Sequence, residues 1–357
     1  MVVKKIPRWI GSPGLPARQM AQVPRMMHNG DAMMIDGYGR RINYLRLSVT
    51  DRCNLRCRYC MPADGVPWLP HGGILSYEEL FLVARTAVSL GIGKIRVTGG
   101  EPLVRKGILG FLSRLAGIPG LRQFVLTTNG LLLEEMAAPL KSAGVQRLNI
   151  SIDSLVPENF LRITRGGEVA RVISGIAAAE AAGFPIKLNM VVMRGVNDHE
   201  VVDFAALTLD KPYAVRFIEF MPSGAEEGDW RSLVVPGREI LDRIGERFPF
   251  DEVARGEMAG PAKDYRIRGA AGTIGVITPV TGHFCDRCNR IRVTASGMAK
   301  GCLFSRKETD LKPILRGNDP SVLEKTLLRI VGTKPGKHRF CEGPPGPSPL
   351  DMSRVGG

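Results

Sequence analysis

Six short segments with alternating apolar side chains recur along the chain, and each is separated from the next by a stretch long enough for a helix. The first is YLRLSVT, residues 44–50, and its period of two is that of a strand with one buried face. The others are KIRVTGG, QFVLTTNG, RLNISIDS, IKLNMVVM and AVRFIEFM. The intervening stretches show helical spacing and begin at Ser76, Val104, Leu131, Glu168 and Asp198. Strands that alternate with helices predict parallel βαβ units, in an open sheet or in a barrel.

Polar side chains occupy one face of several of these strands. In RLNISIDS the apolar residues would face the helices, which leaves Asn149, Ser151 and Asp153 on the opposite face. The strands of a parallel sheet covered on both sides are usually apolar on both faces. A repeated polar face therefore indicates a wet lumen. We expect an α/β fold, a partial (βα)6 TIM-type barrel, whose strand ends carry the chemistry.

Four regions follow from the change of pattern along the chain. Residues 1–33 are rich in proline, glycine and basic side chains without a sustained period, and we expect a disordered extension there. Residues 34–245 carry the barrel pattern. Residues 246–330 contain short β-like pieces such as GTIGVITPV and predict a smaller C-terminal region. Proline and glycine in residues 331–357 predict an extended tail, which ends in Gly356 and Gly357.

Composition excludes several classes of protein. No apolar run reaches the roughly 20 residues needed to span a bilayer, and no secretory signal opens the chain, so we expect no membrane association and a cytoplasmic location. Lys and Arg outnumber Asp and Glu by 49 to 35, which favours a polyanionic partner. Seven cysteines are too few for a disulfide scaffold, and six of them form two tight sets, as is typical of metal ligation in a reducing compartment.

The first set, Cys53, Cys57 and Cys60, lies in CNLRCRYC, in the loop after the first predicted strand. Structural zinc is nearly always four-coordinate, and this motif has no fourth cysteine or histidine. Three thiolates on a [4Fe-4S] cluster leave one iron open for another ligand. The spacing therefore favours an open iron–sulfur cluster over zinc.

The second set, Cys285, Cys288 and Cys302, has the spacing C-x2-C-x13-C. Here His283 could complete a Cys3His zinc site, and the spacing alone favours zinc.

The first cysteine motif, with Tyr59 before its last cysteine and GGEP at residues 99–102, resembles that of the radical S-adenosylmethionine (SAM) superfamily. Together with the second motif and its CNRIR segment, the chain is similar to the GTP 3',8-cyclase family from Met34 to its terminal Gly-Gly pair. This resemblance reverses the zinc interpretation. It implies a second [4Fe-4S] cluster that binds the guanine base of GTP, with His283 as a neighbour rather than a ligand.

The resemblance also implies cofactors, an activity and partners. The cofactors are two [4Fe-4S] clusters and S-adenosyl-L-methionine, which yields a 5'-deoxyadenosyl radical. That radical takes the 3' hydrogen of GTP, and C3' then attacks C8, in the first step of molybdenum cofactor biosynthesis. The expected partners are GTP, a second copy of the chain in a homodimer, an electron donor and the downstream cyclic pyranopterin monophosphate synthase. Nucleic acid is not expected.

Side chains must hold the triphosphate, because the chain has no G-x-x-x-x-G-K-[ST] loop and Arg forks match phosphate oxygens. By resemblance, the GTP contacts fall on Arg46, Arg96, Thr127, Lys187, Arg290, Ile291 and Arg292, with Ile291 acting only through its backbone or packing. The SAM contacts fall on Tyr59, Gly100, Ser151 and Met221. The terminal Gly356 and Gly357 match a pair that the family requires for activity.

Two alternatives remain at this point. Another radical SAM enzyme with an auxiliary cluster, such as a peptide-modifying maturase, usually carries more C-terminal cysteines. A zinc-bearing nucleic-acid-binding protein would suit the formal charge of +14. It would leave CNLRCRYC and GGEP unexplained, and 6% aromatic residues offer no stacking platform.

Overall fold

The computed structural model describes residues 33–221, 229–317, 319–338 and 352. The predicted N-terminal extension, apart from Met33, and the terminal Gly356 and Gly357 lie outside the described residues.

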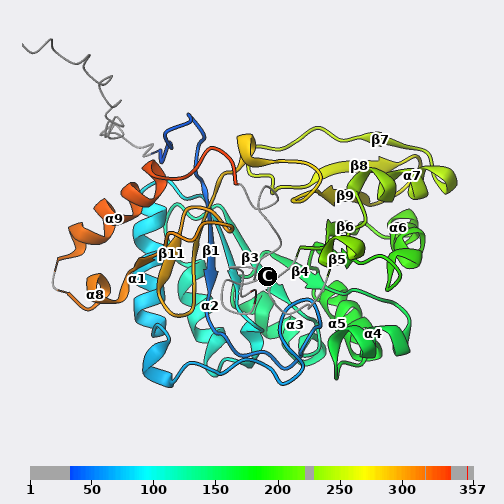
Figure 1. Cartoon of the computed structure of the whole chain (residues 1–357). Helices are drawn as coiled ribbons and strands as arrows, with labels where there is room; N and C mark the ends of the chain where they lie inside the picture. Colours follow the sequence, from blue (N-terminus) through cyan, green and yellow to red (C-terminus); the bar gives the residue numbers. More distant parts are fainter. Residues whose placement is uncertain (1–32, 222–228, 318, 339–351, 353–357) are drawn as a thin grey trace, which may run out of the picture.

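All six segments with alternating apolar residues form strands, and they lie in chain order in one parallel sheet (Figure 1). They are β1 (Tyr44–Ser48), β2 (Lys94–Thr98), β3 (Gln123–Thr128), β4 (Arg147–Ser151), β5 (Ile186–Val192) and β6 (Ala214–Glu219). The predicted fold class, a partial TIM-type barrel, is confirmed.

Helices follow the strands and lie on the outside of the curved sheet (Figure 1). They are α1 (Tyr77–Ser89), α2 (Ile108–Ala116), α3 (Leu133–Ser142), α5 (Val169–Ala181) and α6 (Val201–Asp210). Helix α1 begins at a capping box, because Ser76 Oγ accepts from Glu79 N at 3.1 Å and the Glu79 carboxylate accepts from Ser76 N at 2.7 Å. Against the helices the strands present fully buried apolar side chains such as Leu148 and Ile150. Helix α4 (Pro157–Thr164) was not predicted.

The C-terminal region joins both edges of this sheet. Strand β9 (Thr273–Ile277) pairs in parallel with β6, and β10 (Arg290–Val293) pairs in parallel with β1. Beyond them the antiparallel strands are β7 (Phe250–Glu252), β8 (Lys263–Ile267), β11 (Met298–Lys300) and β12 (Thr309–Asp310). The result is one sheet with the order β12-β11-β10-β1-β2-β3-β4-β5-β6-β9-β8-β7.

Two of the expected boundaries fall inside helices. Residue 245 lies within helix α7 (Gly237–Arg247), and the strands that follow it pair into the barrel sheet. Pairing both edges of the six-stranded core satisfies backbone groups that would otherwise be left open. Helix α9 (Pro320–Gly332) continues two residues into the range expected to be extended, because Val331 is fully buried in the core; the short α8 (Lys312–Leu315) precedes it.

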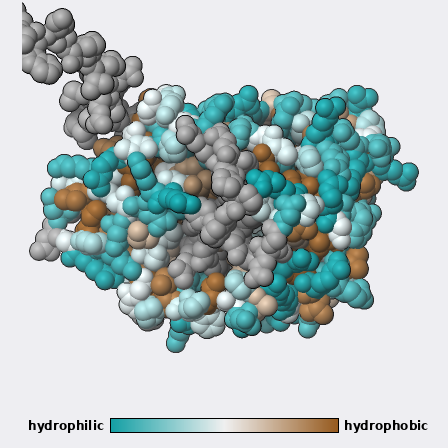
Figure 2. Space-filling view, in the orientation of Figure 1, coloured by the Kyte–Doolittle hydropathy of each residue, from teal (hydrophilic) through white to brown (hydrophobic). Residues whose placement is uncertain are grey.

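The surface is mostly hydrophilic on the face that Figure 2 shows. Among the described residues, no helix combines the length and the apolar character needed to cross a membrane.

Candidate active site

Three arginines stand side by side on the inner face of the barrel. Arg292 in β10, Arg46 in β1 and Arg96 in β2 occupy the same register on neighbouring strands. Two residues earlier on the same three strands, Tyr44 lies in register between Arg290 of β10 and Lys94 of β2. All three arginines, with Tyr44 and Arg290, line one cavity. We call Arg292, Arg46 and Arg96 the arginine row.

Burial and repulsion from neighbouring cations lower the pKa values of the arginine row. Burial, and then repulsion from Arg292 and Arg96, hold the pKa of Arg46 well below its ordinary value. Burial and then Arg290 lower the pKa of Arg292 to about 10. Burial raises the pKa of the Tyr44 phenol, but the surrounding cations, led by Arg96, lower it by more. Cations this crowded favour a polyanionic ligand between them.

Further polar groups extend the inner face toward β6. Arg216 in β6 lines the cavity and pairs with Asp264 at 3.1 Å. With its amide turned so that the oxygen faces Arg96, Asn149 accepts from that guanidinium at 2.7 Å. Thr127 Oγ1 is buried without a hydrogen-bond partner among the described residues. Sequence reasoning missed Arg216, although the alternation in AVRFIEFM places it opposite the apolar side chains.

Two residues predicted to contact GTP are not among those that line the cavity. Lys187 lies in β5, where it pairs in register with Asn149, and burial, followed by Arg216 and Arg147, lowers its pKa to about 6. The Ile291 side chain is 1% exposed and packs in the hydrophobic core, so it faces away from the arginine row. Only its backbone or its packing can serve a ligand.

The first cysteine set lies in a loop that helix α4 holds from outside. Arg56 N donates to Thr164 O at 3.0 Å, and Arg58 N donates to Ile163 O at 2.9 Å, both at the C-terminal end of α4. The Arg165 side chain donates to Met61 O at 2.9 Å. The three thiols are close enough that, after burial and Asp153, Cys60 and Cys53 help to raise the pKa of Cys57. A shared cluster would relieve this by holding all three as thiolates.

The GGEP segment packs against the backbone that leads into the cysteine loop. Gly100 N donates to Thr50 O at 2.8 Å, and a Cβ on Gly100 would lie 2.3 Å from Arg52 O. Gly100 is therefore required for the close approach of two backbone segments, because it carries no Cβ. Glu101 then accepts from Asn129 N at 2.6 Å and Thr128 Oγ1 at 2.9 Å, which joins the segment to the end of β3.

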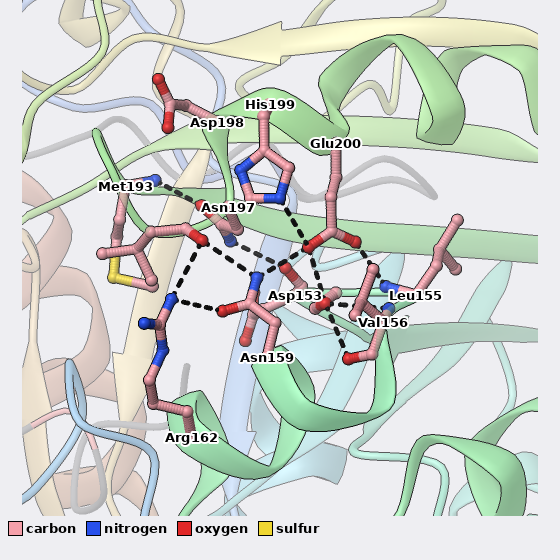
Figure 3. A network of polar contacts seen from close by, with 12 residues as sticks. Asp153, Leu155, Val156, Asn159, Arg162, Met193, Asn197, Asp198, His199 and Glu200 are labelled. Carbon is pink, nitrogen blue, oxygen red and sulfur yellow. Dashed lines mark hydrogen bonds and ion pairs between the residues drawn. The ribbon is translucent and has the colours of Figure 1, made fainter.

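Asp153, two residues after β4, connects the cysteine loop to the barrel. Its carboxylate accepts from Tyr59 Oη at 2.7 Å and from Val191 N at 2.8 Å. Figure 3 shows the network behind it, in which Asn197 Nδ2 donates to Asp153 O at 2.7 Å. In the same network the buried Glu200 accepts from Asn159 Nδ2 at 2.7 Å and so anchors α4 (Figure 3). Burial raises the pKa of Asp153 to about 6.

The second cysteine set comes from two segments. Cys285 begins the short helix η5 (Cys285–Arg287) and Cys288 follows it, whereas Cys302 lies two residues after β11. All three thiols line the same cavity as Tyr59, Ser151 and Met221. Two cations hold the surrounding backbone. Arg40 Nη1 donates to Cys285 O at 2.6 Å, and Lys334 Nζ lies 3.4 Å from Cys288 Sγ. Burial opposes ionisation of Cys288, yet Arg290 and Lys334 bring its pKa down to about 6, which favours a thiolate ligand.

A zinc site near this set has a geometric basis. Ligand atoms of His283, Cys285 and His338 all lie within 4.8 Å of one another. Such a site would use one cysteine and leave Cys288 and Cys302 unused. Sequence reasoning did not identify His338, whose ring lies 4.3 Å from that of Phe304.

The cavity thus unites most of the predicted site. Its lining includes Arg46, Tyr59, Arg96, Thr127, Ser151, Met221, Cys285, Cys288, Arg290, Arg292 and Cys302. It does not include Cys53, Cys57, Cys60, Gly100, Lys187 and Ile291. Among the described lining residues, Asp153 is the only carboxylate, against five arginines. The donor set fits one cluster on each cysteine trio and a polyanion between them.

Comparisons with known proteins agree with this arrangement. Residues 47–208 match the family model of the radical SAM superfamily, and residues 213–340 match that of Molybdenum Cofactor Synthesis C. The chain is 64% identical over 325 residues to the GTP 3',8-cyclase of Geobacter sulfurreducens, covering 91% of this chain and 99% of that protein. It is 48% identical over 327 residues to the GTP 3',8-cyclase of Pelotomaculum thermopropionicum, covering 91% of this chain and all of that protein.

A solved structure supports the fold alone. The crystal structure of Streptococcus suis SuiB bound to S-adenosylmethionine is similar with a TM-score of 0.53 at 13% identity. The match covers 80% of this chain and 66% of that one.

Substituting Gly100 with alanine should disrupt the cysteine loop, because the new Cβ would meet Arg52 O at 2.3 Å. We expect less iron bound by the first cysteine set after anaerobic reconstitution and a lower unfolding temperature. Gly110→Ala is the matched control, since its Cβ would meet nothing within 4 Å and alanine stabilises a helix by about 1 kcal/mol over glycine. Equal behaviour of the two variants would contradict the packing assigned to Gly100.

Proposed function

The chain belongs to the GTP 3',8-cyclase family of radical SAM enzymes, and we propose that it cyclises GTP to (8S)-3',8-cyclo-7,8-dihydroguanosine 5'-triphosphate in the first step of molybdenum cofactor biosynthesis. One feature of the site supports this proposal most strongly. Strand β10 begins two residues after Cys288 and brings Arg290 and Arg292 beside β1. A single segment thus joins a cluster ligand to the arginine row, as a substrate with a base at one end and phosphates at the other requires.

The first cysteine set would hold the cluster that works with SAM. Cys53, Cys57 and Cys60 supply three thiolates, and an open iron is left for SAM. When bound, this cluster and SAM supply the 5'-deoxyadenosyl radical that takes the 3' hydrogen of GTP. The chain contributes positioning, for which we assign contacts with SAM to Tyr59, Gly100, Ser151 and Met221. Tyr59 is held in place by its 2.7 Å hydrogen bond to Asp153.

The triphosphate would lie against the arginine row. Arg46, Arg96 and Arg292 present guanidinium groups whose N–H donors match phosphate oxygens, and Arg290 and Arg216 extend this surface. Binding relieves the repulsion that lowers the pKa of Arg46. Thr127 Oγ1 offers a further hydroxyl. Lys187 would act from the strand next to Arg216, by charge more than by direct contact.

The guanine base would meet the second cluster, held by Cys285, Cys288 and Cys302. Phe284 and Phe304 line the cavity beside these cysteines and exclude water from the base. Arg40 and Lys334 fix the cysteine loops through carbonyl groups and through Cys288 Sγ. Orientation of two reactants in one dry cavity is the protein's main contribution to such a reaction.

The C-terminal tail would complete the site. Met352 lines the cavity, four residues before Gly356. We therefore propose a catalytic role for Gly356 and Gly357, since residues without side chains leave the most room for two ligands.

Four further expectations stay predictions. These are the homodimer, the cytoplasmic location, the electron donor and the downstream cyclic pyranopterin monophosphate synthase. The alternative of a peptide-modifying maturase is disfavoured, because the chain is 64% identical to a GTP 3',8-cyclase over 91% of its length.

Anaerobic reconstitution tests the proposal most directly. We expect about 8 irons per chain from two four-iron clusters, and cyclised product from GTP. Serine at Cys53, Cys57 or Cys60 should abolish SAM cleavage, whereas serine at Cys285, Cys288 or Cys302 should spare some cleavage and abolish product. One zinc with half that iron, or cyclisation by the second group of variants, would refute the proposal.

Alanine at Arg96 or Arg292 should weaken GTP binding much more than guanosine binding. Each substitution removes charge-assisted phosphate contacts of about 1.5–3 kcal/mol. The measurement is titration calorimetry with both ligands. Arg238→Ala is the control, because that side chain is 93% exposed on α7. A similar loss for the two ligands would argue against phosphate recognition by the row.

GTP binding should be linked to proton uptake at Lys187. Its pKa of about 6 leaves the free side chain mostly neutral at neutral pH, and a nearby triphosphate would favour the charged form. The number of protons taken up on GTP binding is measured by calorimetry at about pH 7.5 in buffers of different ionisation enthalpy. Lys187→Met should take up fewer protons than wild type, by up to about one. The exposed Lys325→Met should match wild type. If Lys187→Met takes up as many protons as wild type, Lys187 does not lie near the bound triphosphate.

Removal of Gly356 and Gly357 should leave both clusters and GTP affinity nearly unchanged. Product formation should fall by about tenfold or more, because the two reactants lose their final alignment. Iron content, GTP affinity and turnover are measured on the same preparation. Normal turnover by the shortened chain would exclude the tail from catalysis.

A further inference from the structure

Glu219 is a fully buried carboxylate at the end of β6 that no step above uses. One oxygen accepts from Gly237 N at 2.8 Å and from the Thr281 hydroxyl. The other accepts from Val280 N at 2.9 Å and Thr281 N at 3.0 Å. All four donors are neutral, and no cation pairs with Glu219 among the described residues.

These bonds join three parts of the molecule. Gly237 is the first residue of α7, whose N-terminus favours a carboxylate. Val280 and Thr281 belong to the segment that runs from β9 to the second cysteine set, four residues before Cys285. Glu219 itself lies two residues before Met221, which we assign to SAM. The carboxylate thus connects the SAM side of the barrel to the approach to the second cluster.

A small apolar cluster reinforces this connection. Phe220, next to Glu219, is fully buried with Ile163 and Met193. Tyr59 from the first cysteine loop and Val280 from the segment before the second both pack against this cluster. Displacement of the segment that Glu219 holds would therefore change how the two cysteine loops are spaced.

The geometry points to Glu219 as a positioning residue that sets the second-cluster loop, and with it GTP, relative to the SAM-derived radical. This inference rests on the proposed function. A buried carboxylate without a cation is stable only while its donors stay in place, so it fixes the segment tightly. A glutamine would put an amide N–H2 against at least one backbone N–H in either orientation.

The experiment compares SAM cleavage with cyclisation in Glu219→Gln. Misplaced GTP should leave the radical formed but unused, so the ratio of 5'-deoxyadenosine to cyclised product should rise by about tenfold, the factor that loss of one buried hydrogen bond supplies. The electron paramagnetic resonance signal of the first cluster should be retained, and that of the second should change. Glu246→Gln, an exposed residue of α7, should match wild type.

Asp153→Asn distinguishes this role from general loosening of the barrel. Asp153 holds Tyr59 on the SAM side, so its variant should slow cleavage and cyclisation together and keep their ratio. Thr281→Val removes one donor and leaves Glu219 in place, so it should raise the ratio by a smaller factor.

An unchanged ratio in Glu219→Gln, with both cluster signals intact, would overturn the inference. If that variant loses both clusters, the ratio in Thr281→Val decides, and an unchanged value there also overturns it. Failure of the wild-type chain to form any product would instead refute the proposed function.

Discussion

Like charges on one face of a sheet repel each other, and the site of this protein depends on that repulsion being tolerated. Arg292, Arg46 and Arg96 lie at one register on three adjacent strands, and they are crowded enough that Arg292 and Arg96 lower the pKa of Arg46. The opposite face of the same strands supplies the compensating stability, since Leu45, Leu47 and Ile291 are almost completely buried there. The barrel can therefore hold a binding surface that becomes favourable only when a polyanion occupies it.

The strands that complete the edges of the sheet also complete the site. Strand β10 satisfies the open edge of β1, and by doing so it delivers Arg290, Arg292 and the preceding Cys288 to the cavity. At the other edge β9 pairs with β6 and leads into the segment that Glu219 holds. Asp153 performs the corresponding task for the first cysteine loop through Tyr59. Buried carboxylates that accept from neutral donors thus fix both loops without adding cations to a basic cavity.

Sequence alone predicted what local periodicity can encode. The six strands followed from apolar alternation, and the inward direction of Ser151 and Asp153 followed from the same period. The pairing of β10 with β1 could not be predicted in that way, because it joins residues about 246 positions apart and no local pattern specifies such contacts. Arg216 could have been found from its strand's alternation, whereas Lys334 and Glu219 acquire their partners only through the tertiary fold. Gly100 shows a different limit. Its motif was recognised from the sequence, but its close contact with the backbone at Arg52 is visible only in the structure.

The central claim is that one cavity brings the SAM-derived radical to the ribose of GTP. It is tested most directly with GTP carrying deuterium at C3', incubated anaerobically with SAM, a reductant and the reconstituted protein. The account predicts that deuterium is recovered in 5'-deoxyadenosine as cyclised nucleotide forms. Product formation with 5'-deoxyadenosine free of deuterium from that position would contradict it.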